Sequence, residues 1–165
     1  MRLILLTFWA LLLVMSSPVY AENRVAFLGL TMLDTSLQTT ELGQDPAEVA
    51  RLQMVEELVS ETFAANGCEL LDIEPARADL ERVVNPAKCY GCDTRIGEDL
   101  GAEFVLVGEV QKVSNLILSM NLQLRDVTTG QTVKGRVVDI RSNTDDSWLR
   151  GMRYILKTAF FKDKT

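Results

Sequence analysis

The chain has 165 residues with 17 Lys and Arg, 23 Asp and Glu and no His, which gives a net charge of −6. An acidic balance is a poor match for nucleic acid, because binding to phosphates depends on clustered basic side chains. Without His, a Ser or Cys catalytic triad of the usual kind lacks its base. The chain also has no glycine-rich phosphate loop, which argues against a nucleotide cofactor. From these observations together we predict no nucleic-acid partner, no enzymatic activity and no cofactor.

The first 21 residues have the pattern of a signal peptide. Arg2 precedes an apolar run, Leu3–Met15, that is too short to span a bilayer comfortably, and the segment ends at Ala21 with the small-x-small spacing that signal peptidase cleaves. We predict cleavage after Ala21, export to the periplasm of a Gram-negative bacterium and no stable insertion in the membrane afterwards. The next residue is Glu22 and not Cys, which argues against lipid attachment there. Residues 22–165 are predicted to form one domain.

The next part of the chain predicts a strand, a loop and a helix. Arg24–Leu30 is a short apolar run typical of an interior strand, and the polar Thr31–Gly43 is predicted to be a loop. Asp45 is the expected N-cap of a helix, Glu48 is expected to complete a capping box, and apolar residues follow at helical spacing. Asn66-Gly67 is a typical helix end.

A second strand and a second helix are expected next. Cys68–Ile73 is short and apolar enough to form a strand, and a helical crossover predicts that it runs parallel to the first strand. Pro75–Val84 is predicted to be a helix that ends before Asn85-Pro86.

The motif Cys89-Tyr-Gly-Cys92 allows three interpretations. In an oxidising compartment such a pair most simply forms a disulfide, which is our prediction. A redox-active pair is the second interpretation, because the following segment, Asp93–Leu100, predicts a short helix with Asp93 as its N-cap, and a helix N-terminus lowers the pKa of a thiol. A thiolate metal site with Cys68 as third ligand is the third, but the chain has no His to complete it, so we predict no metal. A thiol-disulfide oxidoreductase or thiol-based metal-binding protein remains the alternative function.

The second half predicts three strands in succession. Phe104–Val113 is predicted to be a strand whose first part, Phe104–Val107, is apolar on both faces, and Leu116–Arg125 alternates apolar and polar residues with a period of two. Asp126–Gly130 supplies a turn into Thr132–Ile140, where Val137-Val138 breaks the alternation and suggests a bulge. The expected fold is therefore α/β (α+β), with a single mixed sheet of about five strands, the order β-α-β-α-β-β-β-α and helices packed on the sheet.

The last predicted strand leads into a polar cluster and a final helix. Asn143 or Thr144 is expected to cap this helix, and acidic residues in its first turn suit the helix dipole. Trp148, Met152, Ile155 and Ala159 fall on one side. The simple interpretation is a well-capped surface helix. The sharper hypothesis is a protein-interaction surface, since Trp and Arg are preferred interface anchors, and it consists of Asp139, Arg141, Asn143, Asp145, Asp146, Trp148 and Arg150.

These segments together carry a family resemblance. Lys112–Leu118, Arg125–Gly130 and Asp139–Arg150, with the Cys89/Cys92 pair and Leu100-Gly-Ala-Glu, resemble a family of exported bacterial proteins often encoded near periplasmic quinoprotein alcohol dehydrogenases. More distantly, the strand at Val25–Leu30 and the Asp-x-x-Thr-Gly hairpin are similar to the amino-terminal α/β domain of the Tol-system propeller protein and to curli-secretion lipoproteins, which bind other proteins. The resemblance implies a non-catalytic periplasmic accessory protein whose partner is a quinoprotein alcohol (methanol) dehydrogenase or one of its assembly factors.

Overall fold

The computed structural model describes residues 23–36, 39, 43 and 45–162. The predicted signal peptide and part of the predicted loop after the first strand lie outside the described residues. The helices and strands are, in chain order, β1 (Arg24–Asp34), α2 (Pro46–Ala65), β2 (Glu69–Leu70), α3 (Arg77–Leu80), α4 (Cys92–Asp99), β3 (Phe104–Ser114), β4 (Ile117–Asp126), β5 (Thr132–Arg141) and α5 (Asp145–Ile155), which continues into a π-helical turn, Leu156–Phe160.

The strands form one five-stranded sheet in the order β2-β1-β3-β4-β5. β1 is parallel to both β2 and β3, whereas β3, β4 and β5 are antiparallel to their neighbours. This confirms the predicted fold class, including the parallel pairing of the first two strands. The sheet has two edges, which are the two-residue β2 and the ten-residue β5.

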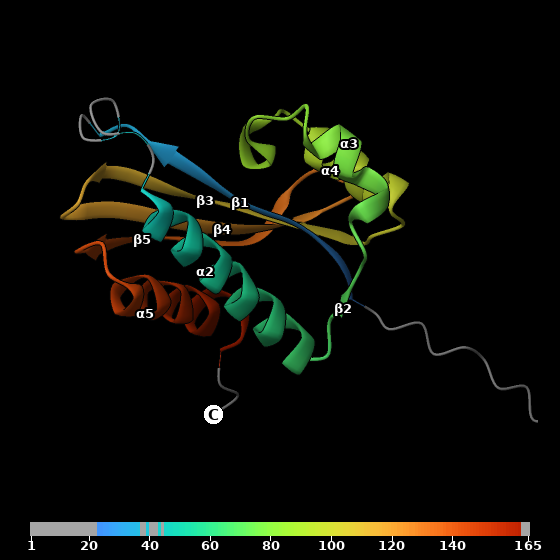
Figure 1. Cartoon of the computed structure of the whole chain (residues 1–165). Helices are drawn as coiled ribbons and strands as arrows, with labels where there is room; N and C mark the ends of the chain where they lie inside the picture. Colours follow the sequence, from blue (N-terminus) through green and yellow to red (C-terminus); the bar gives the residue numbers. More distant parts are fainter. Residues whose placement is uncertain (1–22, 37–38, 40–42, 44, 163–165) are drawn as a thin grey trace, which may run out of the picture.

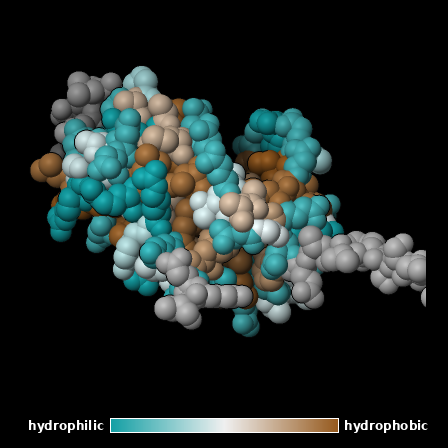
Figure 2. All heavy atoms as spheres, turned by 90° about the horizontal axis from the view of Figure 1, so that it is seen from below, coloured by the Kyte–Doolittle hydropathy of each residue, from teal (hydrophilic) through white to brown (hydrophobic). Residues whose placement is uncertain are grey.

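Helices lie on both faces of the sheet but cover them unequally. Figure 1 shows α2 and α5 side by side along one face, with α3 and α4 over one end of the opposite face. The larger core cluster lies under α2 and α5 and a smaller one lies under α4. Figure 2 views the α2 and α5 side, where hydrophilic residues cover much of the surface and hydrophobic ones show between them.

The alternation of apolar and polar residues along β4 explains why α2 and α5 pack on this face of the sheet. Leu118, Met120 and Leu122 are completely buried, while Ser119 and Asn121 between them point to the other face and are only partly buried. Apolar side chains spaced by two residues share one side of a strand, so their burial against α2 and α5 is a direct consequence of the sequence pattern.

Three strand predictions need correction. The strand predicted over Cys68–Ile73 is shorter, because only Glu69–Leu70 pairs with β1. β1 does not end at Leu30 but continues to Asp34, because β3 extends beside it and pairs Lys112 with Asp34. The predicted bulge at Val137-Val138 is wrong, since these residues pair regularly with Asn121 and Met120 of β4. The irregularity in this hairpin lies instead near the turn, between Leu124 and Arg125.

The helix predictions are partly correct. Asp45 caps α2 as expected, accepting a hydrogen bond from the amide of Ala47 at 2.9 Å. The helix predicted over 75–84 is shorter, consisting of a 3₁₀ turn at Glu74–Ala76 followed by the single-turn α3. Asp93 does not cap α4, because the preceding cap position is Gly91 in a left-handed conformation (φ 96°) and Asp93 lies buried inside the first turn.

Candidate interaction site

A buried cluster of charges joins β1, β3 and α2 at one end of the sheet. The Lys112 Nζ atom lies 2.6 Å from Glu48 Oε1 and 3.3 Å from Asp34 Oδ2. Glu48 is 1% exposed, so the prediction that it would complete a capping box is wrong; it faces the interior and pairs with a lysine from a distant strand. A buried carboxylate is tolerated only when it is paired and hydrogen-bonded, and Lys112 meets that requirement.

The pKa values of Asp34 and Lys112 are shifted toward the charged forms. Burial raises the pKa of Asp34, but hydrogen bonds from Ser36 and Thr39 and the nearby Lys112 outweigh it and bring that pKa from 3.8 to about 2. Burial likewise lowers the pKa of Lys112, but its bonds to Glu48 and Asp34 prevail and raise the pKa above its ordinary 10.5. Both residues are therefore ionised at neutral pH and hold the end of β1 against β3.

The cluster extends into the turn between β5 and α5 through Asn143. Its Nδ2 donates to Glu48 Oε1 at 2.5 Å, and its Oδ1 accepts a hydrogen bond from Trp148 Nε1 at 2.9 Å. Trp148 is completely buried. The prediction that Trp148 is a surface anchor is therefore wrong, and its role is to pack α5 on the sheet. The sequence already places Trp148 on the apolar side of the helix with Met152 and Ile155, and this spacing indicated that the side chain would be buried.

The charged residues in the first turns of α5 are exposed and locally paired. Thr144 caps the helix, and its hydroxyl accepts a hydrogen bond from the Ser147 amide. Asp145 lies 2.8 Å from Arg51 Nε of α2, and Asp146 lies 3.0 Å from Arg150 one turn later. The predicted cap is thus confirmed. The Asp146–Arg150 pair is exposed and contributes little to stability, and the carboxylates of Asp145 and Asp146 are accessible to a partner.

A groove runs between the end of β5 and the outer side of α5. Its volume is about 450 Å³, and we call it the β5–α5 groove; its lining residues are Val138, Asp139, Ile140, Arg141, Ser147, Arg150, Gly151 and Tyr154. Three residues of the predicted surface, Asp139, Arg141 and Arg150, come together here from a strand and a helix. The groove therefore contains the exposed, strand-derived part of the predicted surface.

Sequence reasoning missed Tyr154, the exposed aromatic residue of the groove. It is 47% exposed, and Arg136 of β5 lies over its ring at 5.3 Å and donates a hydrogen bond to its hydroxyl at 3.1 Å. A Tyr held by an Arg is a rigid amphipathic contact of the kind that interfaces use. Its spacing of four residues from Arg150 on a helix was the signal that could have identified it.

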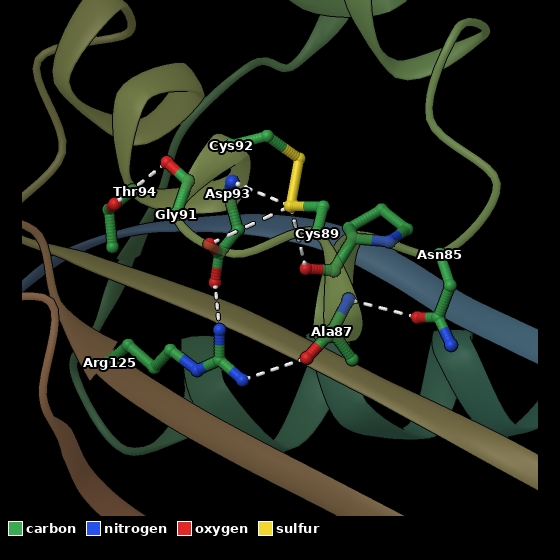
Figure 3. Close-up of a disulfide and its surroundings, with 9 residues drawn as sticks. Asn85, Ala87, Cys89, Gly91, Cys92, Asp93, Thr94 and Arg125 are labelled. Carbon is green, nitrogen blue, oxygen red and sulfur yellow. Dashed lines mark hydrogen bonds and ion pairs between the residues drawn. A yellow bond between two sulfur atoms is a disulfide. The ribbon is translucent and has the colours of Figure 1, made fainter.

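The Cys89–Cys92 disulfide is present, as predicted, at the start of α4. Figure 3 shows it beside a buried ion pair: the Asp93 amide donates to Cys89 Sγ at 3.2 Å, and the Asp93 carboxylate lies 2.7 Å from Arg125 of β4. Arg125 also donates to the Ala87 carbonyl at 2.8 Å. These contacts fix the turn against the sheet and resemble a structural support more than a mobile redox site.

The remaining cysteine lies apart from this turn. Cys68 is partly buried against the larger core cluster, and that burial raises the pKa of its thiol. Within the described part of the chain, no group of three or more His, Cys, Asp and Glu side chains is arranged to hold a metal ion. None of the helices in that same part has the length and apolar character needed to cross a membrane.

The sheet and its helices define an α/β domain in which β5 is the long edge strand and the β5–α5 groove lies beside it. The chain belongs to the family DUF3280, described as "Protein of unknown function (DUF2380)", whose model matches residues 23–160. No curated protein matches the chain.

Solved structures with the same fold come from bacteria. The LpoB C-terminal domain from Salmonella enterica is 17% identical, with a TM-score of 0.51 over 76% of this chain and 87% of that one. Lipoprotein GNA1162 from Neisseria meningitidis is 13% identical, with a TM-score of 0.50 over 74% and 83%. PelC from Paraburkholderia phytofirmans, solved as a dodecamer, is 12% identical, with a TM-score of 0.50 over 84% and 89%. At these identities the likeness shows the fold, and a lipoprotein among the neighbours agrees with the distant resemblance expected from the sequence.

Proposed function

We propose that this chain is an exported, non-catalytic accessory protein that binds a partner protein in the periplasm through the β5–α5 groove. The observation that carries the proposal is the meeting of Asp139, Arg141 and Arg150 at one groove beside an exposed Tyr154. Exposed arginines and an exposed tyrosine around a hollow are the composition of a recognition site.

Export rests on the signal-peptide pattern of residues 1–21, and the accessory role is supported by neighbours of the same fold that include a bacterial lipoprotein. The partner we propose is a quinoprotein alcohol (methanol) dehydrogenase or one of its assembly factors. Its support is the sequence resemblance carried by Lys112–Leu118 and Asp139–Arg150. In the structure these two segments lie together, because Lys112 and Asn143 both contact Glu48.

The test is capture of partners from the periplasm with a tagged chain and two matched variants. Arg136→Glu/Arg150→Glu reverses two charges beside Tyr154 at the groove. Arg77→Glu/Arg82→Glu makes the same charge change at the start of α3 and just after its end, where both residues are exposed and pair locally with Glu74 and Asp79.

We expect the unmodified chain and the α3 variant to recover the same dehydrogenase subunits, and the groove variant to lose them. Equal recovery of these subunits by all three chains would show that the groove does not bind the partner. Recovery of no dehydrogenase component by the unmodified chain would remove the partner.

A further inference from the structure

The outer edge of β5 carries backbone groups that pair with no other strand in the part of the chain the structure describes. The Ser142 amide donates to the Leu116 carbonyl at 3.3 Å, which fixes the phase of the antiparallel ladder between β5 and β4. Alternate residues of an antiparallel strand turn their amides to opposite sides. The outward amides are therefore those of Gly135, Val137, Asp139 and Arg141.

This edge is neither shortened nor interrupted by Pro, two devices that often protect an exposed strand. β5 is ten residues long, contains no Pro and pairs with β4 in regular register from Lys134 to Arg141. Val137 in its middle is 63% exposed. Long regular edges with exposed apolar residues attract additional strands, and natural proteins usually shorten, bend or cover them. The other edge, β2, is only two residues long.

The β5–α5 groove lies directly beside this edge. Gly151 brings α5 close to the sheet: a side chain there would place its Cβ 2.6 Å from Ile140 and 3.1 Å from the sulfur of Met120. Arg150 and Tyr154 on the same helix line the groove. A strand added to β5 would point every second side chain toward α5, so the groove would receive those side chains.

The charge around the edge indicates what kind of strand fits. Residues 132–157 contain six Lys and Arg against three Asp and Glu, although the whole chain has a net charge of −6. Of these, Arg136 contacts Tyr154 at the groove, and Arg141 and Arg150 line it. A local positive surplus in an acidic protein favours an acidic partner segment.

We propose that β5 accepts an extended acidic segment of the partner protein as a sixth strand, whose alternate side chains occupy the β5–α5 groove. Backbone hydrogen bonds to the four outward amides supply the affinity, and contacts with Arg136, Arg150 and Tyr154 supply the preference for acidic residues. This inference rests on the proposed function, because it describes how the partner is held.

The test uses the purified chain and a nine-residue peptide of alternating Glu and Val, with amide hydrogen exchange measured by NMR. In the free protein the amides of Gly135, Val137, Asp139 and Arg141 exchange fast, while those of Arg136, Val138 and Ile140 are protected by β4. With peptide at about ten times its Kd, exchange at the four outward amides slows about tenfold. A peptide of alternating Lys and Val leaves them unchanged. Slowing at other residues, or none with the acidic peptide, overturns the proposal.

Two variants at one position separate strand addition from simple charge attraction. Val137→Pro removes an outward amide that β4 does not use, a change that edge strands tolerate. Val137→Thr keeps that amide. We expect the Pro variant to lose the slowing and the Thr variant to keep it; equal slowing in both would exclude strand addition.

Should Val137→Pro melt below the unmodified chain by circular dichroism, Arg136→Glu/Arg150→Glu replaces it. This variant should reverse the preference and bind the Lys and Val peptide. Retained preference for the acidic peptide contradicts the assigned groove. These measurements use no cell extract, so their outcome is independent of the capture experiment. If the peptide binds but no dehydrogenase is captured, only the proposed partner is refuted. If the dehydrogenase is captured but the amides of β5 are not protected, only strand addition is refuted.

Discussion

Replacing Lys112 by Met should destabilise the protein more than any surface change. Lys112 is buried and neutralises Glu48, which is 1% exposed, and Asp34. Its removal leaves Glu48 as a buried carboxylate without its cation, still accepting a hydrogen bond from the side-chain amide of Asn143. Breaking a buried pair in this way costs about 3–5 kcal/mol, a large share of the roughly 5–15 kcal/mol that stabilises an ordinary domain.

The double variant Lys112→Met/Glu48→Gln separates the lost charge balance from a general packing defect. The Gln carbonyl still accepts the hydrogen bond from Asn143, and no buried carboxylate remains at position 48. The double variant should therefore regain about 1–3 kcal/mol relative to Lys112→Met, since replacing both charges of a buried pair is often nearly neutral.

Urea unfolding followed by tryptophan fluorescence measures both variants. Trp148 is the sole Trp of residues 22–165 and hydrogen-bonds to Asn143 in the same network, so its emission reports on this end of the sheet. A loss under about 1 kcal/mol for Lys112→Met, within the range of exposed pairs, would refute the claim that the cluster is buried. A double variant less stable than the single one would refute the charge-balance argument.

Three further predictions follow from single contacts. The pKa of Asp34 is about 2 in the folded protein and near 3.8 in the unfolded chain, so its contribution to stability is complete above about pH 4 and is lost as the pH falls toward 2. An Asp34→Asn variant should therefore lose less stability than the unmodified chain over that pH interval, as measured by urea unfolding. Equal losses in the two proteins would contradict the shifted pKa. Gly151→Ala should destabilise by about 1–3 kcal/mol despite the better helix propensity of Ala, because its Cβ meets Ile140 at 2.6 Å; a raised Tm by circular dichroism would show that α5 shifts without cost. Reducing the Cys89–Cys92 bond opens a loop of only about four residues, and the bond stabilises the protein by about 2 kcal/mol. The Tm should therefore fall by a few degrees while the fold is retained. A reduction potential of this disulfide above about −300 mV would favour the thiol-disulfide oxidoreductase alternative.

Features that depend on neighbouring residues were predictable from the chain. The alternation of Leu118 to Leu124 requires one buried face, and Asp45 before Pro46 begins a helix whatever lies beyond it. The Cys89/Cys92 pair also bonds within one turn, so compartment and spacing were sufficient to predict it.

Features that depend on distant partners were missed or misassigned. Glu48 has the spacing of a capping box, but the arrival of Lys112 from β3 draws its carboxylate inward. Trp148 has the residue type of an interface anchor, yet the apolar stripe of α5 must face the sheet and takes the ring with it. β1 continues past Leu30 because β3 offers ladder partners as far as Lys112.

The sequence by itself determined the number and order of the strands, most helix starts, the disulfide and the acidic character that argues against nucleic acid, because each follows from residues a few positions apart or from composition. Tertiary structure decided which charges are buried, that β5 is the long free edge, and that Asp139, Arg141 and Arg150 meet Tyr154 in one groove. These outcomes depend on contacts across the chain, such as that between Glu48 and Asn143, 95 positions apart. Such contacts arise only when the sheet order brings their elements together, and local patterning does not encode that order.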